Sequence, residues 1–127
     1  MLNGKRILVA EADPVNLSAT VKLLRHHGAE VHTARTGPDA LDILACTTLD
    51  AAVVEVWLPQ VDGFGVMDRV RSMGPEAPPV VCLTTLSLDE AEHVCTEAGF
   101  ACVLDKSCGL EQLLAALSES LDLREAC

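Results

Sequence analysis

The amino-acid sequence predicts an α/β domain in which a parallel β-sheet carries helices on both faces. Two observations lead to this prediction: five short apolar runs have the composition of buried strands, and the segments between them have helical spacing. Such an alternation implies right-handed crossovers between the parallel strands. The strand-like runs are RILVA (6–10), AEVHTA (29–34), AAVVEV (51–56), PVVCL (79–83) and ACVL (101–104).

Each segment between or after these runs has apolar residues three or four positions apart, which is the pattern of a helix with one buried face. Gly28 and Gly99 follow the first and the fourth of these segments and suit the ends of helices. The positions that mark the five helices in order are Leu17, Val21 and Leu24; Ala40, Leu41 and Leu44; Phe64, Met67 and Val70; Leu88 to Ala98; and Leu110, Leu113, Leu114, Leu117 and Leu121.

The chain has 127 residues and a formal net charge of −10. Its length suits one domain, which we expect at 1–123, with 124–127 as an exposed C-terminal end. The negative charge argues against nucleic-acid binding, and no apolar run approaches the roughly 18 residues of a membrane helix. The six cysteines contain no Cys-x-x-Cys pair and the four histidines have no metal-ligand spacing with them. With no secretory signal visible, we expect a cytoplasmic protein with reduced thiols.

Polar side chains follow four of the five predicted strands. Glu11 and Asp13 come after the first strand, Glu55 ends the third, Thr84 follows the fourth and Lys106 follows the fifth. Ligands of open α/β sheets bind beyond the carboxyl ends of the strands, so these side chains are expected to meet at one edge. Polar strand ends are common in themselves, but matching positions on four strands favour a site.

Six motifs in this order and spacing resemble the receiver domain of bacterial response regulators, from Arg6 to about Leu121. They are RILVAEADPVN, AxxGxxAL (34–41), VxxPxxDG (56–63), PVVCLTT, the pair Ala98–Gly99, and LDKS. The resemblance implies a flavodoxin-like sheet with strand order 2-1-3-4-5. Typical members take phosphate from a histidine kinase onto an aspartate with Mg²⁺ and signal through the fourth and fifth helices. It implies a signalling module of a two-component system and not an enzyme.

The acidic half of the family's site is altered in this chain. Glu55 aligns with the phospho-acceptor aspartate, and the family's acidic pair aligns with Glu11 and Ala12. The second member of that pair normally ligates the metal, which alanine cannot do, and Mg²⁺ demands a nearly complete set of oxygen ligands. We assign Asp13 to the acidic pocket with Glu11, although the alternation of side chains at a strand end points it elsewhere. We expect no metal and no other cofactor.

The basic half of the family's site is better preserved. The resemblance gives Thr84 the role of switch residue and Lys106 that of the family's lysine, whereas the switch aromatic is replaced by Val103. Glu55 is one methylene longer than aspartate, and it should reach Lys106 and imitate the charge of a phosphorylated site. Ser107 replaces the usual proline, so we expect a trans Lys106–Ser107 peptide bond.

Trp57 and Leu86 each lie two residues beyond a predicted site residue. The resemblance places both at the rim of the pocket, where they would shield it and restrict a phosphodonor. For Trp57, simple packing at the rim is an equally good interpretation.

The altered residues favour an atypical receiver that works as a phosphorylation-independent interaction or regulatory module. The alternative is a working phospho-acceptor, stand-alone or part of a hybrid histidine kinase, that uses Glu55 or Asp13 with Mg²⁺. An unrelated flavodoxin-like enzyme is disfavoured, because the sequence has no glycine-rich phosphate loop and no nucleophile elbow.

The expected partner is a protein, such as a histidine kinase or an output domain. The acidic residues of the fourth helix and the start of the fifth would form its docking face, or would only keep the domain solvated. Like charges on that face argue for a monomer. These residues are Asp89, Glu90, Glu92, Glu97 and Glu111.

Overall fold

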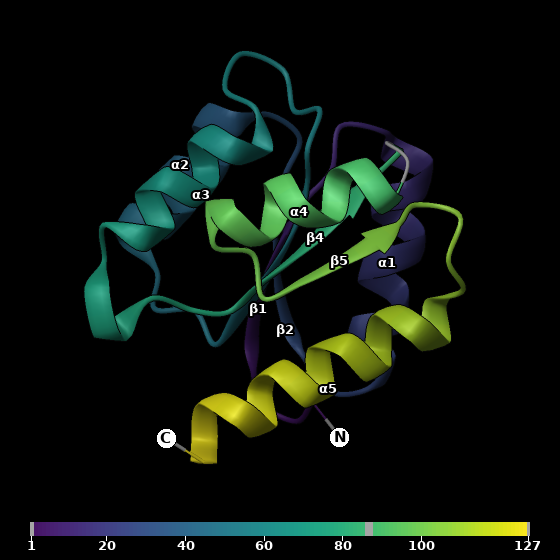
Figure 1. Ribbon diagram of the computed structural model, residues 1–127. Coiled ribbons are helices and arrows are strands. Elements are labelled where there is room, and N and C mark those ends of the chain that lie inside the picture. Colours follow the sequence, from purple (N-terminus) through teal and green to yellow (C-terminus); the bar gives the residue numbers. More distant parts are fainter. Residues whose placement is uncertain (1, 86–87, 127) are drawn as a thin grey trace.

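The computed structural model describes residues 2–85 and 88–126, with no side-chain description for 88–90 and 125–126. Its centre is a five-stranded parallel sheet in the order β2-β1-β3-β4-β5, which confirms the predicted topology (Figure 1). Each strand end lies within one residue of the predicted run. The strands are β1 (Arg6–Ala10), β2 (Glu30–Ala34), β3 (Ala51–Glu55), β4 (Val80–Thr84) and β5 (Cys102–Asp105).

Five α-helices and one short 3₁₀ helix connect and follow the strands. Local side chains begin three of them: Asp13, Thr36 and Asp62 each accept hydrogen bonds from backbone N–H groups of the first helical turn. No helix within 2–85 or 88–126 is long and apolar enough to cross a membrane. The helices are α1 (Pro14–His26), α2 (Gly37–Cys46), α3 (Gly63–Arg71), η1 (Gly74–Glu76), α4 (Leu88–Ala98) and α5 (Leu110–Ala126).

The two faces of the sheet are buried under different helices (Figure 1). Side chains alternate along β1, so that Leu8 packs in the core with α2, α3 and α4, while Ile7 and Val9 pack in the core with α1 and α5. Both faces of the central strands are therefore dry, which explains their nearly unbroken apolar sequence. Polar side chains of the central strands therefore lie at the strand ends.

The C-terminal end differs from the expectation of an exposed tail that starts at position 124. Helix α5 continues to Ala126, and Arg124 is partly buried. Its guanidinium donates to the carbonyl oxygens of Leu49, Asp50 and Glu76 at 3.1, 2.8 and 3.3 Å. This contact with the loop before β3 and with η1 holds the last turns of α5, so the prediction was wrong for Arg124. Cys127 lies outside the described residues.

The loop after β3 is held close to the sheet by Gly63. A Cβ at this position would lie 2.5 Å from the carbonyl oxygen of Glu55, so that any side chain would push the loop away from the strand end. The N–H of Gly63 also donates to the carbonyl oxygen of Val56 at 2.8 Å. This turn fixes the backbone around Glu55 and carries Trp57.

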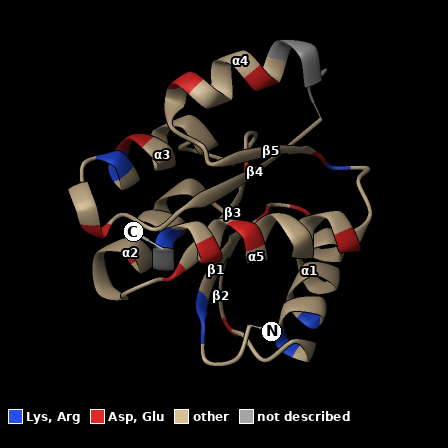
Figure 2. Ribbon diagram, turned by 60° about the horizontal axis from the view of Figure 1, so that its bottom comes forward, with Lys and Arg blue, Asp and Glu red and all other residues tan. Residues whose placement is uncertain are grey.

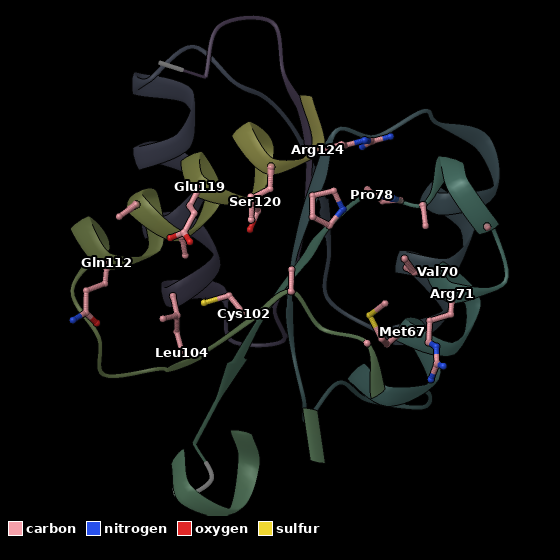
Figure 3. A pocket seen from close by; sticks show the side chains of 18 residues that line it. Met67, Val70, Arg71, Pro78, Cys102, Leu104, Gln112, Glu119, Ser120 and Arg124 are labelled. Carbon is pink, nitrogen blue, oxygen red and sulfur yellow. The ribbon is translucent and has the colours of Figure 1, made fainter. Parts of the chain in front are cut away.

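A hollow lies beside β5, away from the predicted site. Its volume is about 840 Å³, and α5, the end of α3 and the segment before β4 surround it (Figure 3). Met67, Pro78, Cys102 and Leu104 are among its lining residues, whereas Glu11, Glu55 and Lys106 are not. The hollow is thus separate from the predicted site.

Candidate functional site

The parallel register brings the polar residues after the strands to one edge of the sheet. Ala10 pairs with Val54 and Thr84 pairs with Asp105, so the residues that follow β1 and β5 lie beside the ends of β3 and β4. The side chains there are buried: Glu11, Glu55 and Thr84 are only 2%, 5% and 1% exposed. Three carboxyl or hydroxyl groups at such depth need partners.

Lys106 is the partner of both glutamates. Its Nζ lies 2.5 Å from Oε2 of Glu55 and 2.7 and 3.0 Å from Oε1 and Oε2 of Glu11. The backbone N–H of Lys106 donates to the carbonyl oxygen of Thr84 at 2.9 Å, which holds the start of the β5–α5 connection against β4. We call Glu11, Glu55 and Lys106 the carboxylate–lysine cluster. It contains the contact with Lys106 that the sequence predicted for Glu55.

The second oxygen of Glu55 also has a partner. Oε1 accepts a hydrogen bond of 2.7 Å from the backbone N–H of Ala12. The carboxylate therefore bridges β3 to the segment after β1 as well as to the β5–α5 connection. Because Oε1 and Oε2 are both engaged at short distance, the carboxylate is held in one orientation.

The two acids of the cluster have opposite pKa shifts. Burial and a hydrogen bond with Glu55 raise the pKa of Glu11 to about 7, against the opposing effect of Lys106. Burial also acts to raise the pKa of Glu55, but its hydrogen bonds with Glu11, Lys106 and the Ala12 N–H together bring that pKa below its ordinary value. Burial lowers the pKa of Lys106, but the two glutamates outweigh it and raise that pKa. The environment thus gives two chemically identical side chains different pKa values.

Asp13 does not belong to this cluster, which corrects its assignment to the acidic pocket. Its carboxylate oxygens accept from the N–H groups of Val15 and Asn16 at 3.3 and 3.4 Å and so cap α1. An aspartate one residue before a helix-starting proline is well suited to this task, and the helix N-terminus attracts the negative charge. The side chain is therefore directed along α1 and not into the cluster.

The donor set does not suit Mg²⁺. Among the described residues no three His, Cys, Asp or Glu side chains form a group that could hold a metal. Ala12 offers no side-chain oxygen, its carbonyl accepts from Nε and Nη2 of Arg35 at 3.3 and 3.2 Å, and Lys106 holds the nearest carboxylates. A hard cation that prefers about six oxygen ligands would have to displace an ammonium group and a backbone donor.

The remaining predicted residues lie around the cluster in different environments. Trp57 is 57% exposed, and its role at the rim stays a prediction. Val103 is partly buried and packs against the core under α2, α3 and α4. The Lys106–Ser107 bond is trans, which confirms that expectation, and Ser107 donates from its N–H and its hydroxyl to Asp105. The prediction for Leu86 lies outside the described residues.

Sequence reasoning missed the groups that complete the site. The N–H of Ala12 and the guanidinium of Arg35 belong to it, and a cavity of about 80 Å³ beside the cluster is lined partly by Asn16 and Thr20 of α1. A backbone donor leaves no sequence signal. The spacing of Asn16 and Thr20, which places both polar side chains on one face of a helix, could have indicated the cavity.

Asp and Glu residues lie on α4 and α5 (Figure 2), and their role as a docking face stays a prediction. Glu92, Glu97 and Glu111 are exposed, and Glu97 pairs with His93 at 3.3 Å. The side chains of Asp89 and Glu90 lie outside the described part. Three of the five predicted acids are therefore exposed on α4 and the start of α5.

The chain matches the response regulator receiver domain family over residues 7–118. Two relatives are a sensor histidine kinase, RcsC, of Salmonella typhi, and the response regulator MprA of Mycolicibacterium vanbaalenii. They are 32% and 34% identical over 112 residues, which cover 88% of this chain. The matched regions make up 12% and 48% of those proteins, so the chain spans less than half the length of either.

Solved structures agree with this assignment. A CheY-like receiver domain protein from Methanospirillum hungatei has a TM-score of 0.89 at 24% identity, covering 98% of both chains, and shows the same fold. The receiver domain of the sensor histidine kinase PA1611 from Pseudomonas aeruginosa has a TM-score of 0.84 at 26% identity, covers 94% of this chain and 98% of its own, and was solved with magnesium in its active-site cleft. The chain belongs to the response regulator receiver domain family and has the fold of a two-component signalling module.

Proposed function

We propose that this receiver domain works without phosphorylation, as a protein-interaction or regulatory module. The observation that carries the proposal is the state of Glu55: one carboxylate oxygen accepts the N–H of Ala12 and the other contacts the ammonium group of Lys106. Phosphoryl transfer to a carboxylate needs an oxygen placed in line with the donor and positive charge around the transferred group. At this site the positive charge is already neutralised.

The geometry of the longer side chain supports the same conclusion. Phosphoryl transfer depends on position, and a misplacement of about 1 Å can cost about 100-fold in rate. Glu55 moves the carboxylate outward by one methylene, and Ala12 removes a metal ligand that the family normally supplies. A phosphodonor would therefore meet an engaged acceptor without its cation.

The permanent contact between Glu55 and Lys106 favours a single conformation. A ligand shifts an equilibrium only if it binds two states differently. Val103 has no ring that could occupy a second position, and β-branching restricts it mainly to one rotamer well. The domain would thus present the same surface to its partner whether or not a phosphodonor is supplied.

The partner of this proposal is a protein, in keeping with relatives that are named as histidine kinases and response regulators. The exposed acids Glu92, Glu97 and Glu111 favour a basic docking surface on that partner, with binding that weakens as salt is added. The monomeric state, the cytoplasmic location, the lack of catalytic activity and the lack of contact with nucleic acid or membranes stay predictions.

The test is incubation with acetyl phosphate and Mg²⁺, followed by intact-mass spectrometry. We expect no gain of a phosphoryl group for the wild-type chain or for Glu55→Asp, because Ala12 still leaves the metal short of a ligand. The double variant Ala12→Asp with Glu55→Asp should gain one phosphoryl group, more slowly if Trp57 restricts the donor. Glu97→Asp, the same change on exposed α4, is the matched control. A phosphorylated wild-type chain would overturn the proposal.

A further inference from the structure

The carboxylate–lysine cluster contains two acids and one base. With all three groups ionised it would carry one net negative charge, although Glu11 and Glu55 are 2% and 5% exposed. An unbalanced buried charge is costly, and such groups take up a proton instead. One proton on the acid pair would make the cluster neutral.

The other charged or titratable groups near Glu11 do not balance this charge. The carboxylate of Asp13 caps α1, and Arg35 is an exposed residue whose guanidinium donates to the carbonyl of Ala12, so that solvent screens its charge. The thiol of Cys108 lines the same small cavity as Glu11, and burial raises its pKa, so it is neutral at pH 7. The cluster must therefore be balanced from within.

The hydrogen-bond geometry identifies Glu11 as the acid that holds the proton. Oε1 of Glu55 faces a backbone N–H, a fixed donor that requires an acceptor there. Oε1 of Glu11 is fully buried and has no aligned hydrogen-bond donor, although Nζ of Lys106 lies 2.7 Å away. A proton on Glu11 can be shared with Glu55, which agrees with the raised pKa of Glu11 and the lowered pKa of Glu55.

The cluster also has a route to neighbouring elements. Glu11 and Lys106 line the cavity of about 80 Å³ together with Asn16 and Thr20 of α1 and Leu113 of α5. This is room for about two water molecules, at roughly 30 Å³ each. A change of charge at Glu11 would alter the field at the first half of α1 and at the first turn of α5.

We propose that Glu11 and Glu55 form a proton-binding site that takes up and releases one proton near neutral pH, and that α1 and the start of α5 sense its charge. This inference rests on the proposed function in one respect. If the site does not accept phosphate, proton binding would be the signal that regulates it. Protonation leaves the cluster neutral, whereas proton release leaves two carboxylates facing one ammonium group. Proton release would then strengthen the attraction of Glu11 for Lys106 at the start of the β5–α5 connection, and would set the two carboxylates against each other.

The test is a pH titration of the glutamate side-chain carboxyl carbons by NMR on the whole chain. One carboxyl should titrate with a midpoint of about 7. Backbone amide shifts of Asn16, Thr20 and Leu113 should follow the same midpoint. Absence of any glutamate midpoint above about 6 would overturn the inference.

Variants assign the midpoint to its residue. Glu11→Gln retains a donor for Glu55 and should abolish the neutral midpoint, whereas Glu97→Gln on exposed α4 should leave it unchanged. Glu55→Gln should lower the midpoint by about one pH unit or more, because the neighbouring carboxylate raises the pKa of Glu11. If Glu11→Gln fails to fold, Glu55→Gln decides: an unshifted midpoint contradicts the inference.

The outcome is independent of the phosphorylation test. A chain that gains phosphate but shows the neutral midpoint would contradict only the proposed function. A chain that stays unphosphorylated and has no neutral midpoint would contradict only the proton-binding site.

Discussion

The sheet edge that holds Glu55 and the surface of α4 and α5 both contain several acids. The two regions differ in whether these acids are buried and in what they pair with. At the strand ends two buried carboxylates share one ammonium group at distances of 2.5 to 3.0 Å. On the helices Glu92, Glu97 and Glu111 are exposed, and Glu97 pairs with a side chain, His93, that is 78% exposed. Glutamate thus links neighbouring segments through buried contacts in one region and is a solvated surface charge in the other.

The difference shows that the two regions respond to different changes. A buried charge depends on its partner, because removing the partner leaves it in a medium that cannot solvate it. An exposed charge is stabilised by water, so its pairing contributes little to folding. The strand-end edge should therefore determine the stability and titration of the domain, and the helix surface should act only on a partner.

The largest effect should follow from Lys106→Met, which retains the aliphatic stem but removes the ammonium group. We expect a loss of about 3 kcal/mol in the free energy of unfolding, measured by urea denaturation, because both glutamates lose their counter-charge. The loss should be smaller at pH 5 than at pH 8, since Glu11 is protonated at pH 5 and only Glu55 still needs that charge.

Lys22→Met on exposed α1 is the control for this change, and Glu97→Gln is the corresponding control for the helix surface. Each should alter the free energy of unfolding by less than about 0.5 kcal/mol. Equal effects of Lys106→Met and Lys22→Met would remove the distinction between the two regions.

A second effect is expected in the pH dependence of the wild-type chain. Folded Glu11 keeps its proton up to about pH 7, whereas the unfolded residue loses it near 4.5, so the folded state binds more protons in that window. The free energy of unfolding should therefore fall as the pH rises from about 4.5 to 7, by at most about 1.4 kcal/mol per pH unit.

Glu55 acts in the opposite direction and in a different window. Its lowered pKa adds stability as the pH rises toward 4.5 and nothing more above that value. Glu11→Gln should flatten the fall between 4.5 and 7. A stability that rises throughout this interval in the wild-type chain would show that Glu11 is ionised in the folded state.

The fold could be predicted from the sequence because each strand is an apolar run that the sheet buries on both faces. The contact between Glu55 and Lys106 was readable for a related reason, since both residues follow strands whose ends the parallel register brings together. The placement of Asp13 was decided by local competition, because the first turn of α1 offers free N–H groups to its carboxylate. Arg124 binds backbone carbonyl groups, and Glu55 binds the backbone N–H of Ala12. Contacts to the backbone leave no pattern of side chains in the sequence.

The most direct test of the central claim is the response of the wild-type chain to beryllofluoride with Mg²⁺, a mimic of the phosphoryl group, observed through amide NMR shifts. Glu55 already has both oxygens engaged, so we predict that the amides of α4 and α5 keep their shifts as the mimic is added. The Ala12→Asp, Glu55→Asp double variant provides the positive control, and its site should accept the mimic. Large, saturable shifts of α4 and α5 in the wild-type chain would contradict a phosphorylation-independent receiver.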